Sequence, residues 1–231
     1  MTDHKAHTVS QYDKELTKLR ENLMYLGALV DRAVANAMKA IVDRDSDLAR
    51  QVIADDDAVD RLDEVTEELS IRLLALRQPA ASDLRFITTA IKTNGHLERI
   101  GDIAAKIAEK CLLLNQETPL KPYIDLPRMA EISRSMMHRS LEAMIKEDVA
   151  LACEVRRDDE IVDSLNEQIF RELITFMMED AKTITRALLV MQVSKNMERI
   201  SDHAKSIADM VIFMVTGKNV RHRQPSGEEL R

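Results

Sequence analysis

The phrase LERIGDIAAKIAE, at residues 97–109, returns 100 residues later as MERISDHAKSIAD, at residues 197–209. In each copy an Arg follows a Glu directly, and an Asp stands four residues beyond that Glu. Upstream, Val59-Asp60 returns as Val162-Asp163 with a shift of 103 residues. Self-similarity at a fixed period indicates a duplicated structural unit, so the chain is predicted to fold as two copies of one motif.

The composition indicates that the repeated unit is helical. The 231 residues include only five Gly and five Pro, no Trp, and 3% aromatic residues in all. Strands and hairpins draw on aromatic residues and on turn-forming Gly and Pro, whereas helices favour Ala, Leu, Met, Glu and Arg. We therefore expect an all-α fold.

Breaks in the apolar pattern divide each copy into three helices. Between residues 9 and 77 there is no Pro, but VDRDSDLA at 42–49 has the composition of a turn with a helix N-cap. RQPAASDLR at 77–85 predicts a stop, with Ser82 as a candidate N-cap of a third helix that runs to about Asn115. The order then recurs, with helices from about 128 to 146, to about Glu179 and to about Thr216.

The clearest boundary in the chain is NQETPLKPYIDLP at 115–127, which holds three of the five prolines and predicts an extended connector. We therefore predict six helices in two tandem three-helix bundles. The first bundle is assigned to residues 1–117 and the second to 118–231, which ends in a short polar C-terminal tail.

Charge and hydropathy exclude several classes of partner. The net charge of −7 argues against a surface for nucleic acid, because phosphate contacts need clustered Lys and Arg. No apolar run approaches the length of a membrane span, and the N-terminus lacks the basic-then-apolar order of a signal peptide. The expected location is the cytoplasm.

Each copy carries two pairs of acidic residues with helical spacing. Side chains four residues apart on a helix project together, so two adjacent helices would present four carboxylates to a shared space. Such a group repels itself unless it is neutralised, and all-oxygen ligands suit Mg, Ca, Mn or Fe. The candidate metal ligands are Asp56, Asp60, Glu98 and Asp102 in the first copy and Asp159, Asp163, Glu198 and Asp202 in the second.

The same residues have other interpretations. In a chain that is 32% charged, acidic pairs arise by chance, and those of the middle helix fit a solvated face. Local ion pairs with Arg99 and Arg199 would neutralise part of the charge. Helical geometry places Lys106 on a different face from Glu98 and Asp102. From the residues alone, the choice between a cation and a protein partner stays open.

Signatures of catalysis are absent from the sequence. A di-iron bundle would normally carry Glu-x-x-His on two helices, but no His here has a Glu three positions before it. The histidines, His96 and His203 among them, are interpreted as ordinary surface or boundary residues. Phosphate-binding loops and nucleophile motifs are also missing. We predict that the protein is not an enzyme, with a metal-binding bundle for storage or redox chemistry, or a purely structural scaffold, as alternatives.

Two phrases, SDLRFITTAIKTNGHLERIGDIAAKIAE at 82–109 and KNMERISDHAKSIAD at 195–209, resemble the PhoU family of regulators of bacterial phosphate uptake. The resemblance extends over essentially the whole chain. One departure is that the second copy has TITR at 183–186 where the first has the DLR phrase ending at Arg85. The surroundings of Arg85 and Arg186 are therefore expected to differ.

The resemblance implies a function that the residues alone do not. Members of this family are cytoplasmic two-bundle proteins that tend to dimerise and act as negative regulators of the phosphate-starvation response. They link the ATPase of a high-affinity phosphate ABC transporter to a membrane sensor histidine kinase, so contact with the membrane is only indirect. Some members carry metal clusters on acidic pairs, which map here to the eight carboxylates above. Arg85, Arg99 and Arg199 are the residues expected to bind partners.

Overall fold

The structure is a computed structural model that describes residues 3–77 and 79–220. This part of the chain contains six α-helices and one short 3-10 turn, η1 (Ala181–Thr183), and it contains no strand. The helices are α1 (Asp3–Asp43), α2 (Ser46–Arg77), α3 (Ala81–Leu114), α4 (Asp125–Lys146), α5 (Val149–Glu179) and α6 (Ile184–Thr216). The predicted all-α fold with six helices is confirmed.

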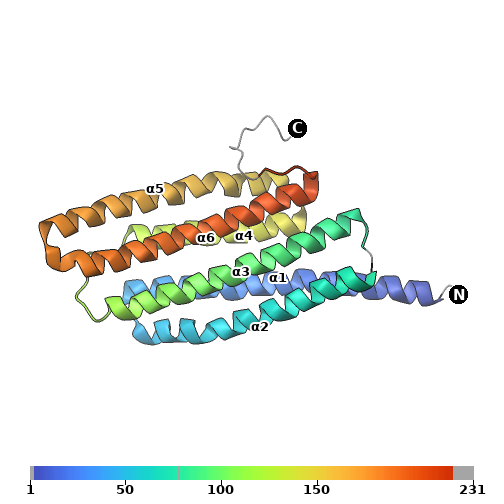
Figure 1. Ribbon diagram of the computed structural model, residues 1–231, viewed down its shortest axis with the longest axis horizontal. Helices are drawn as coiled ribbons and strands as arrows, with labels where there is room; N and C mark the ends of the chain where they lie inside the picture. Colours follow the sequence, from blue (N-terminus) through green and yellow to red (C-terminus); the bar gives the residue numbers. More distant parts are fainter. Residues whose placement is uncertain (1–2, 78, 221–231) are drawn as a thin grey trace.

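The six helices run alternately in opposite directions and lie nearly parallel to one long axis (Figure 1). Helices α3 and α6 lie side by side in the middle, and α1 and α4 lie behind them and contact each other. On the outside, α2 packs on α1 and α3, while α5 packs on α4 and α6. Each repeat is therefore a three-helix bundle, and the core is continuous from one bundle to the other.

The turns between the first two helices of each repeat have the same construction. Arg44 and Glu147, which are 103 positions apart, both adopt a left-handed backbone conformation, with φ of 57° and 56°. The residue after each is an Asp that caps the next helix. Asp45 Oδ1 accepts from the main-chain N–H of Leu48 at 2.9 Å, and Asp148 Oδ1 accepts from that of Leu151 at 3.0 Å. The predicted turn and N-cap at 42–49 are confirmed.

The predicted N-cap at Ser82 is wrong. Helix α3 begins one residue before Ser82, and its N-cap is Ala80, whose side chain makes no capping hydrogen bond. Extended geometry at Ala80 and the preceding Pro79 are sufficient to start the helix without a polar cap. The composition of the segment therefore predicted the helix but not its first residue.

The two repeats face each other about an approximate two-fold axis. Asp31 and Arg134 occupy equivalent positions in α1 and α4, and they form a bidentate ion pair with distances of 2.7 and 2.9 Å. At the ends of α3 and α6, Arg85 Nε donates to the carbonyl of Met214 at 2.8 Å, and Arg186 Nη1 donates to that of Thr118 at 2.9 Å. Arg85 therefore contacts the last helix of the second repeat, whereas Arg186 contacts the connector between α3 and α4, so the surroundings of the two arginines differ as expected.

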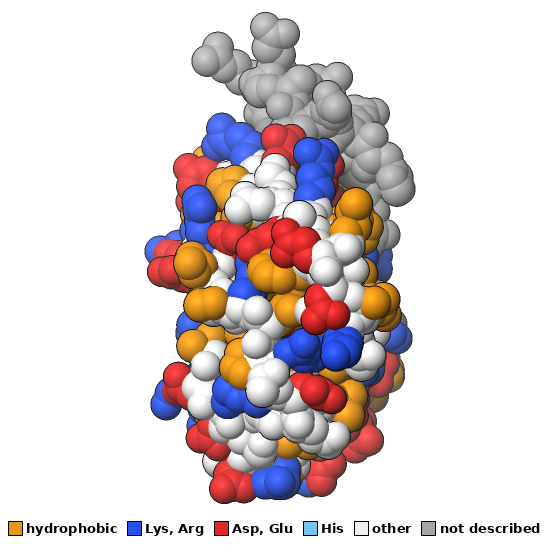
Figure 2. All heavy atoms as spheres, turned by 90° about the vertical axis from the view of Figure 1, so that its left-hand side faces the viewer, with side chains coloured by type: hydrophobic (Ala, Val, Ile, Leu, Met, Phe, Trp, Pro, Cys, Tyr) orange, Lys and Arg blue, Asp and Glu red, His pale blue; other side chains and the backbone are white. Residues whose placement is uncertain are grey.

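The surface carries both signs of charge. Figure 2 shows the end of the molecule with the α1–α2 and α5–α6 turns, where acidic, basic and hydrophobic side chains are interspersed. Within residues 3–77 and 79–220, none of the helices is both long enough and apolar enough to span a membrane. Most of the predicted polar C-terminal tail, residues 221–231, lies outside the described residues.

Candidate functional site: two carboxylate clusters and the seam between the repeats

In the first repeat the structure brings the two predicted acidic pairs together. Asp56 and Asp60 lie on α2 and face Glu98 and Asp102 on α3, and we call these four residues the first cluster. Burial, and after it the negative charges of the other three carboxylates, raise the pKa of Asp56 to about 6. Burial and the charge of Asp102 also raise the pKa of Glu98. The first cluster therefore has too little positive charge nearby to neutralise it.

The second repeat forms the equivalent group, which we call the second cluster: Asp159, Asp163, Glu198 and Asp202. Burial and the charges of the other three carboxylates raise the pKa of Asp202 to about 6. Asp159 is only 1% exposed, and Lys205 Nζ donates a short hydrogen bond to its Oδ2. Its other carboxylate oxygen, Oδ1, is buried and has no hydrogen-bond partner in the described part of the chain.

The two clusters also differ in details that the sequence reasoning missed. Lys106 was predicted on another face, but it lies 3.2 Å from Asp102 Oδ2, because residues four apart on a helix share a face. Gly101 brings α2 and α3 close together, since a Cβ there would lie 3.2 Å from Asp56 Oδ1. Its counterpart in the second repeat is Ser201, whose hydroxyl donates to the carbonyl of Glu198 at 2.7 Å. The sequence signal for this closer packing of α2 and α3 was that one of the two equivalent positions is a glycine, Gly101, and the other is Ser201.

Each cluster is bordered by one polar contact between the middle and last helix of its repeat. In the first repeat, Asn94 Nδ2 donates to Asp63 Oδ1 at 2.6 Å. In the second, Ser194 Oγ donates to Asn166 Oδ1 at 2.6 Å. These residues occupy equivalent positions in the two repeats, so the pairing of the helices is preserved although the chemistry has changed.

The donor chemistry of both clusters fits a hard cation. All eight predicted ligands are carboxylates, which suit Mg, Ca, Mn or Fe, and the buried Asp159 Oδ1 is an acceptor without a donor among the described residues. As the side chains stand, no three Asp, Glu, His or Cys residues of the described ranges converge closely enough to hold a metal ion. The side chains would have to rotate toward one another for a cation to bind.

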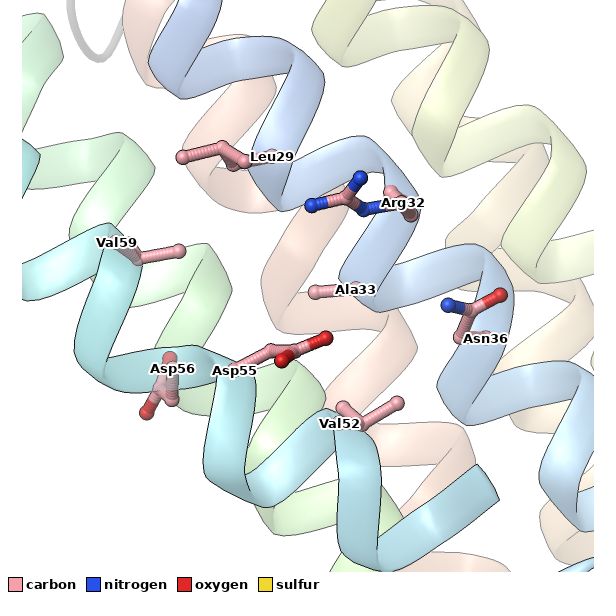
Figure 3. A pocket seen from close by; sticks show the side chains of 8 residues that line it. All are labelled: Leu29, Arg32, Ala33, Asn36, Val52, Asp55, Asp56 and Val59. Carbon is pink, nitrogen blue, oxygen red and sulfur yellow. The ribbon is translucent and has the colours of Figure 1, made fainter.

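A small cleft between α1 and α2 is too narrow to be a ligand site. Its volume is about 20 Å³, which is room for a water molecule. Figure 3 shows that Asp55 points from α2 toward α1, whereas the carboxylate of Asp56 points away from Arg32. Arg32 therefore does not neutralise Asp56 of the first cluster.

The middle of the α3–α6 contact, which we call the seam, carries two histidines and two of the predicted partner-binding arginines. His96 Nδ1 lies 2.9 Å from His203 Nδ1, so two histidines that were interpreted from the sequence as ordinary surface or boundary residues meet across the repeats. Burial and the charges of Arg199 and Arg99 lower the pKa of His203. Both arginines are exposed, and Arg99 Nε lies 3.9 Å from Glu98 Oε2. Arg85 lies near the start of α3, away from the seam.

The structure defines a class of protein: a helical protein with a duplicated three-helix unit and a carboxylate cluster in each copy. Comparison with known proteins identifies the family. The family model of the PhoU domain matches residues 23–111 and 126–211. The chain is 39% identical to the phosphate-specific transport system accessory protein PhoU homolog of Pseudomonas aeruginosa, over 94% of this chain and 90% of the relative. It is 35% identical to the Escherichia coli K12 accessory protein PhoU, over 97% of this chain and 92% of the relative.

Solved structures agree with these matches. The crystal structure of PhoU from Pseudomonas aeruginosa superposes with a TM-score of 0.86 at 38% identity, covering 90% of this chain and 100% of that one. The phosphate transport system regulatory protein PhoU from Streptococcus pneumoniae superposes with a TM-score of 0.83 at 28% identity, covering 90% and 99%. The chain belongs to the PhoU family, which confirms the predicted resemblance.

Proposed function

We propose that this protein is an accessory regulator of phosphate uptake. The observation that carries the proposal is the similarity, over nearly the whole chain, to proteins named as accessory to phosphate-specific transport. The regulator from Streptococcus pneumoniae has the same fold over 90% of this chain. A storage or redox bundle is not favoured, since these relatives are named for transport.

In its finer form, the proposal is a non-enzymatic adaptor in the cytoplasm. The protein acts as a homodimer that contacts the ATPase subunit of a phosphate ABC transporter and a sensor histidine kinase. When phosphate is plentiful it holds the kinase in its phosphatase-biased state, which makes it a negative regulator of the phosphate-starvation response. An adaptor transmits the state of one partner to another through a difference in binding affinity, so exposed charged groups such as Arg99 and Arg199 are suited to the contact.

Deletion of the gene tests the regulatory role. A reporter of the phosphate-starvation response should stay on in high phosphate in the deletion strain, and the wild-type chain should restore repression. Arg99→Ala with Arg199→Ala should restore it poorly although the variant folds, because both side chains are exposed. Arg50→Ala, which removes an exposed arginine of α2 remote from the seam, is the matched control. Normal repression in the deletion strain would refute the proposed function.

We also propose that the two clusters bind Fe, Mn, Mg or Ca as part of this regulation. The support is that each repeat gathers four carboxylates, and that burial, and after it mutual repulsion, raise the pKa of one member of each cluster to about 6. A bound cation would relieve this repulsion. The carboxylates of each cluster would hold the ion, whose positive charge would fix α2 against α3 and α5 against α6.

Elemental analysis of protein purified without a metal-affinity tag tests this second proposal. Stoichiometric metal should be present in the wild-type protein and lost when the third-helix acids of both clusters are neutralised. The variant combines Glu98→Gln, Asp102→Asn, Glu198→Gln and Asp202→Asn. A folded wild-type protein without metal, after incubation with each of the four ions and desalting, would contradict the proposal and leave the acids to partner recognition.

A further inference from the structure

A groove in the second repeat exposes large hydrophobic side chains. The groove lies between α5 and α6 and has a volume of about 520 Å³. Phe170 on α5 and Leu188 and Met191 on α6 form its apolar walls. Phe170 is 50% exposed and Leu188 is 47% exposed, although both belong to well-packed helices. Water contact with a contiguous apolar strip is unfavourable, and such strips mark binding surfaces.

The apolar strip continues beyond the groove toward the α5–α6 turn. Ile174 follows Phe170 by one helical turn, and Ile184 precedes Leu188 by one turn on the opposite helix. Both isoleucines are exposed. Two antiparallel helices with apolar residues at this spacing present ridges and a groove in which a further helix can pack.

The three-helix framework does not require this apolar surface. The positions equivalent to Phe170 and Leu188 in the first repeat are Glu67 and Thr88. Glu67 is exposed there, and α2 and α3 pack together as α5 and α6 do. The exposed Phe170 and Leu188 are therefore a property of the second repeat, and folding of the bundle does not account for them. The flanking Ile174 and Ile184 have exposed apolar counterparts in the first repeat, Ile71 and Leu84.

Charge at one end of the groove selects the kind of segment that fits. Asp163 lines the groove and belongs to the second cluster, and within the described residues no basic group lies within 4 Å of its carboxylate. Lys195, also at the groove, is engaged with Glu198 Oε1 at 2.7 Å. An occupant with apolar side chains over Phe170 and a positive charge next to Asp163 would satisfy both features.

We propose that this groove binds an amphipathic helix of a partner protein. The apolar face of that helix packs on Phe170, Leu188 and Met191, and Lys or Arg side chains at one end meet Asp163. Recognition of a helix in an apolar groove is a common mode of binding, read through residues one turn apart. The proposal deepens the adaptor role and rests on it, since it names the chemistry of one partner segment and where that segment docks.

A synthetic peptide tests the proposal on the full-length protein in the presence of a chelator, since a cation bound at the second cluster would neutralise Asp163. The probe is a fluorescent helical peptide of about 18 residues with one Leu face and Lys residues at one end, compared with a peptide of the same Leu face that carries Glu instead. Fluorescence anisotropy should show the Lys peptide binding at least about tenfold more tightly than the Glu peptide. Equal binding of the two peptides, or no binding of the Lys peptide, would overturn the proposal.

Residues taken from the first repeat provide the matched variants. Phe170→Glu with Leu188→Thr gives the second repeat the side chains of the first, and should weaken binding of the Lys peptide at least about tenfold. Glu67→Gln with Thr88→Ser, at the equivalent positions, should leave binding unchanged. Leu188→Thr alone is the milder variant if the double variant unfolds, as circular dichroism would show. Unchanged binding by a folded groove variant would refute the assignment.

Two further results distinguish a partner helix from a second copy of this chain, and the docking site from the regulatory role. Sedimentation could show that the wild-type protein is a dimer and the groove variant a monomer, with the peptide unable to bind the dimer. In that case a second copy of this chain occupies the groove and the proposal is wrong. If the deletion strain represses normally while the peptide still distinguishes wild type from groove variant, the regulatory role fails but the docking site stands. If the wild-type protein and the groove variant bind the peptide equally well, while the wild-type gene restores repression in the deletion strain, the docking site fails but the regulatory role stands.

Discussion

The two repeats share a framework but neutralise their charges differently. In the first cluster Asp56 is half-buried next to three other carboxylates, and Ala105 occupies the position equivalent to Lys205. In the second cluster Asp159 is almost completely buried and is paired with Lys205. The second repeat also buries an ion pair between Arg156 and Asp209, with 2.7 Å between Nε and Oδ1. The two repeats thus share the pairing of their helices, while in the second repeat a lysine and an arginine are paired with buried carboxylates.

The largest effect of this difference is expected at Asp209. Asp209→Asn should lower the free energy of unfolding by about 3 kcal/mol, because Arg156 would keep its charge in a buried site without a carboxylate. The equivalent change in the first repeat, Glu109→Gln, affects an exposed side chain and should change stability by less than about 0.5 kcal/mol. Urea unfolding of both variants measures the difference. Similar small losses in the two would show that the Arg156 pair is not a source of asymmetry.

Removal of Lys205 should have the next largest effect. Lys205→Met leaves Asp159 charged and buried, and should cost about 2 kcal/mol, less than a fully buried pair since Lys205 is partly exposed. Lys106→Met removes an exposed lysine of the first repeat, whose partner Asp102 is partly exposed, and should cost less than about 0.5 kcal/mol. Chemical denaturation at pH 7 compares them. A larger loss for Lys106→Met would reverse the comparison.

The sequence predicts the fold well because the signals that define it are local and doubled. The Asp caps at Asp45 and Asp148, and the proline-rich connector after Asn115, divide the chain as the structure does. The acidic pairs of neighbouring helices also come together as predicted, since the spacing of four residues fixes their helical face. Their suggested role as ligands stays a prediction.

Contacts between the repeats could not be predicted, because they depend on how two bundles pack. The His96–His203 contact joins residues 107 positions apart that are not equivalent in the repeats, so neither spacing nor symmetry pointed to it. Lys106 was assigned to the wrong face although it follows Asp102 by four residues, a spacing that places the two side chains next to each other on the helix surface. The apolar groove at Phe170 was missed for a similar reason, since it becomes visible only when α5 and α6 lie side by side.

The raised pKa of Asp56 predicts a pH dependence of stability. Its native pKa of about 6 lies above the value of roughly 3.9 expected in the unfolded chain, so the native state binds more protons between these two values. The ionised carboxylate therefore penalises the native state at pH 7, and the penalty disappears as the pH falls through about 6 toward 4.

Asp56→Asn should consequently stabilise the metal-free protein by about 1 kcal/mol at pH 7, a value reduced for solvent screening because Asp56 is only half-buried. The gain should shrink to nothing near pH 4. Thermal or urea unfolding in the presence of a chelator at several pH values measures this. Asp57→Asn, one residue away on the exposed face of α2, is the control. A variant less stable than wild type at pH 7 would indicate that Asp56 has a counter-ion.

The smallest expected effect comes from moving the counter-ion of the second repeat into the first. Ala105→Lys places an ammonium group at the position from which Lys205 reaches Asp159, and the equivalent acid of the first cluster is Asp56. A positive charge at that position should lower the pKa of Asp56 by about half a unit, since an adjacent opposite charge favours the ionised carboxylate but is screened at a partly exposed site.

A pH titration of Asp56 by NMR measures this shift, and Ala105→Gln supplies a side chain of similar polarity without the charge. If Lys and Gln at position 105 give the same pKa for Asp56, the lysine does not reach Asp56 as Lys205 reaches Asp159. The two repeats then differ in the placement of the helices around Gly101 as well as in their side chains. If only Lys lowers it, one substitution accounts for the difference between the clusters. The A105K variant should then also bind cations more weakly than wild type, because its own lysine would compete for the carboxylates of the first cluster.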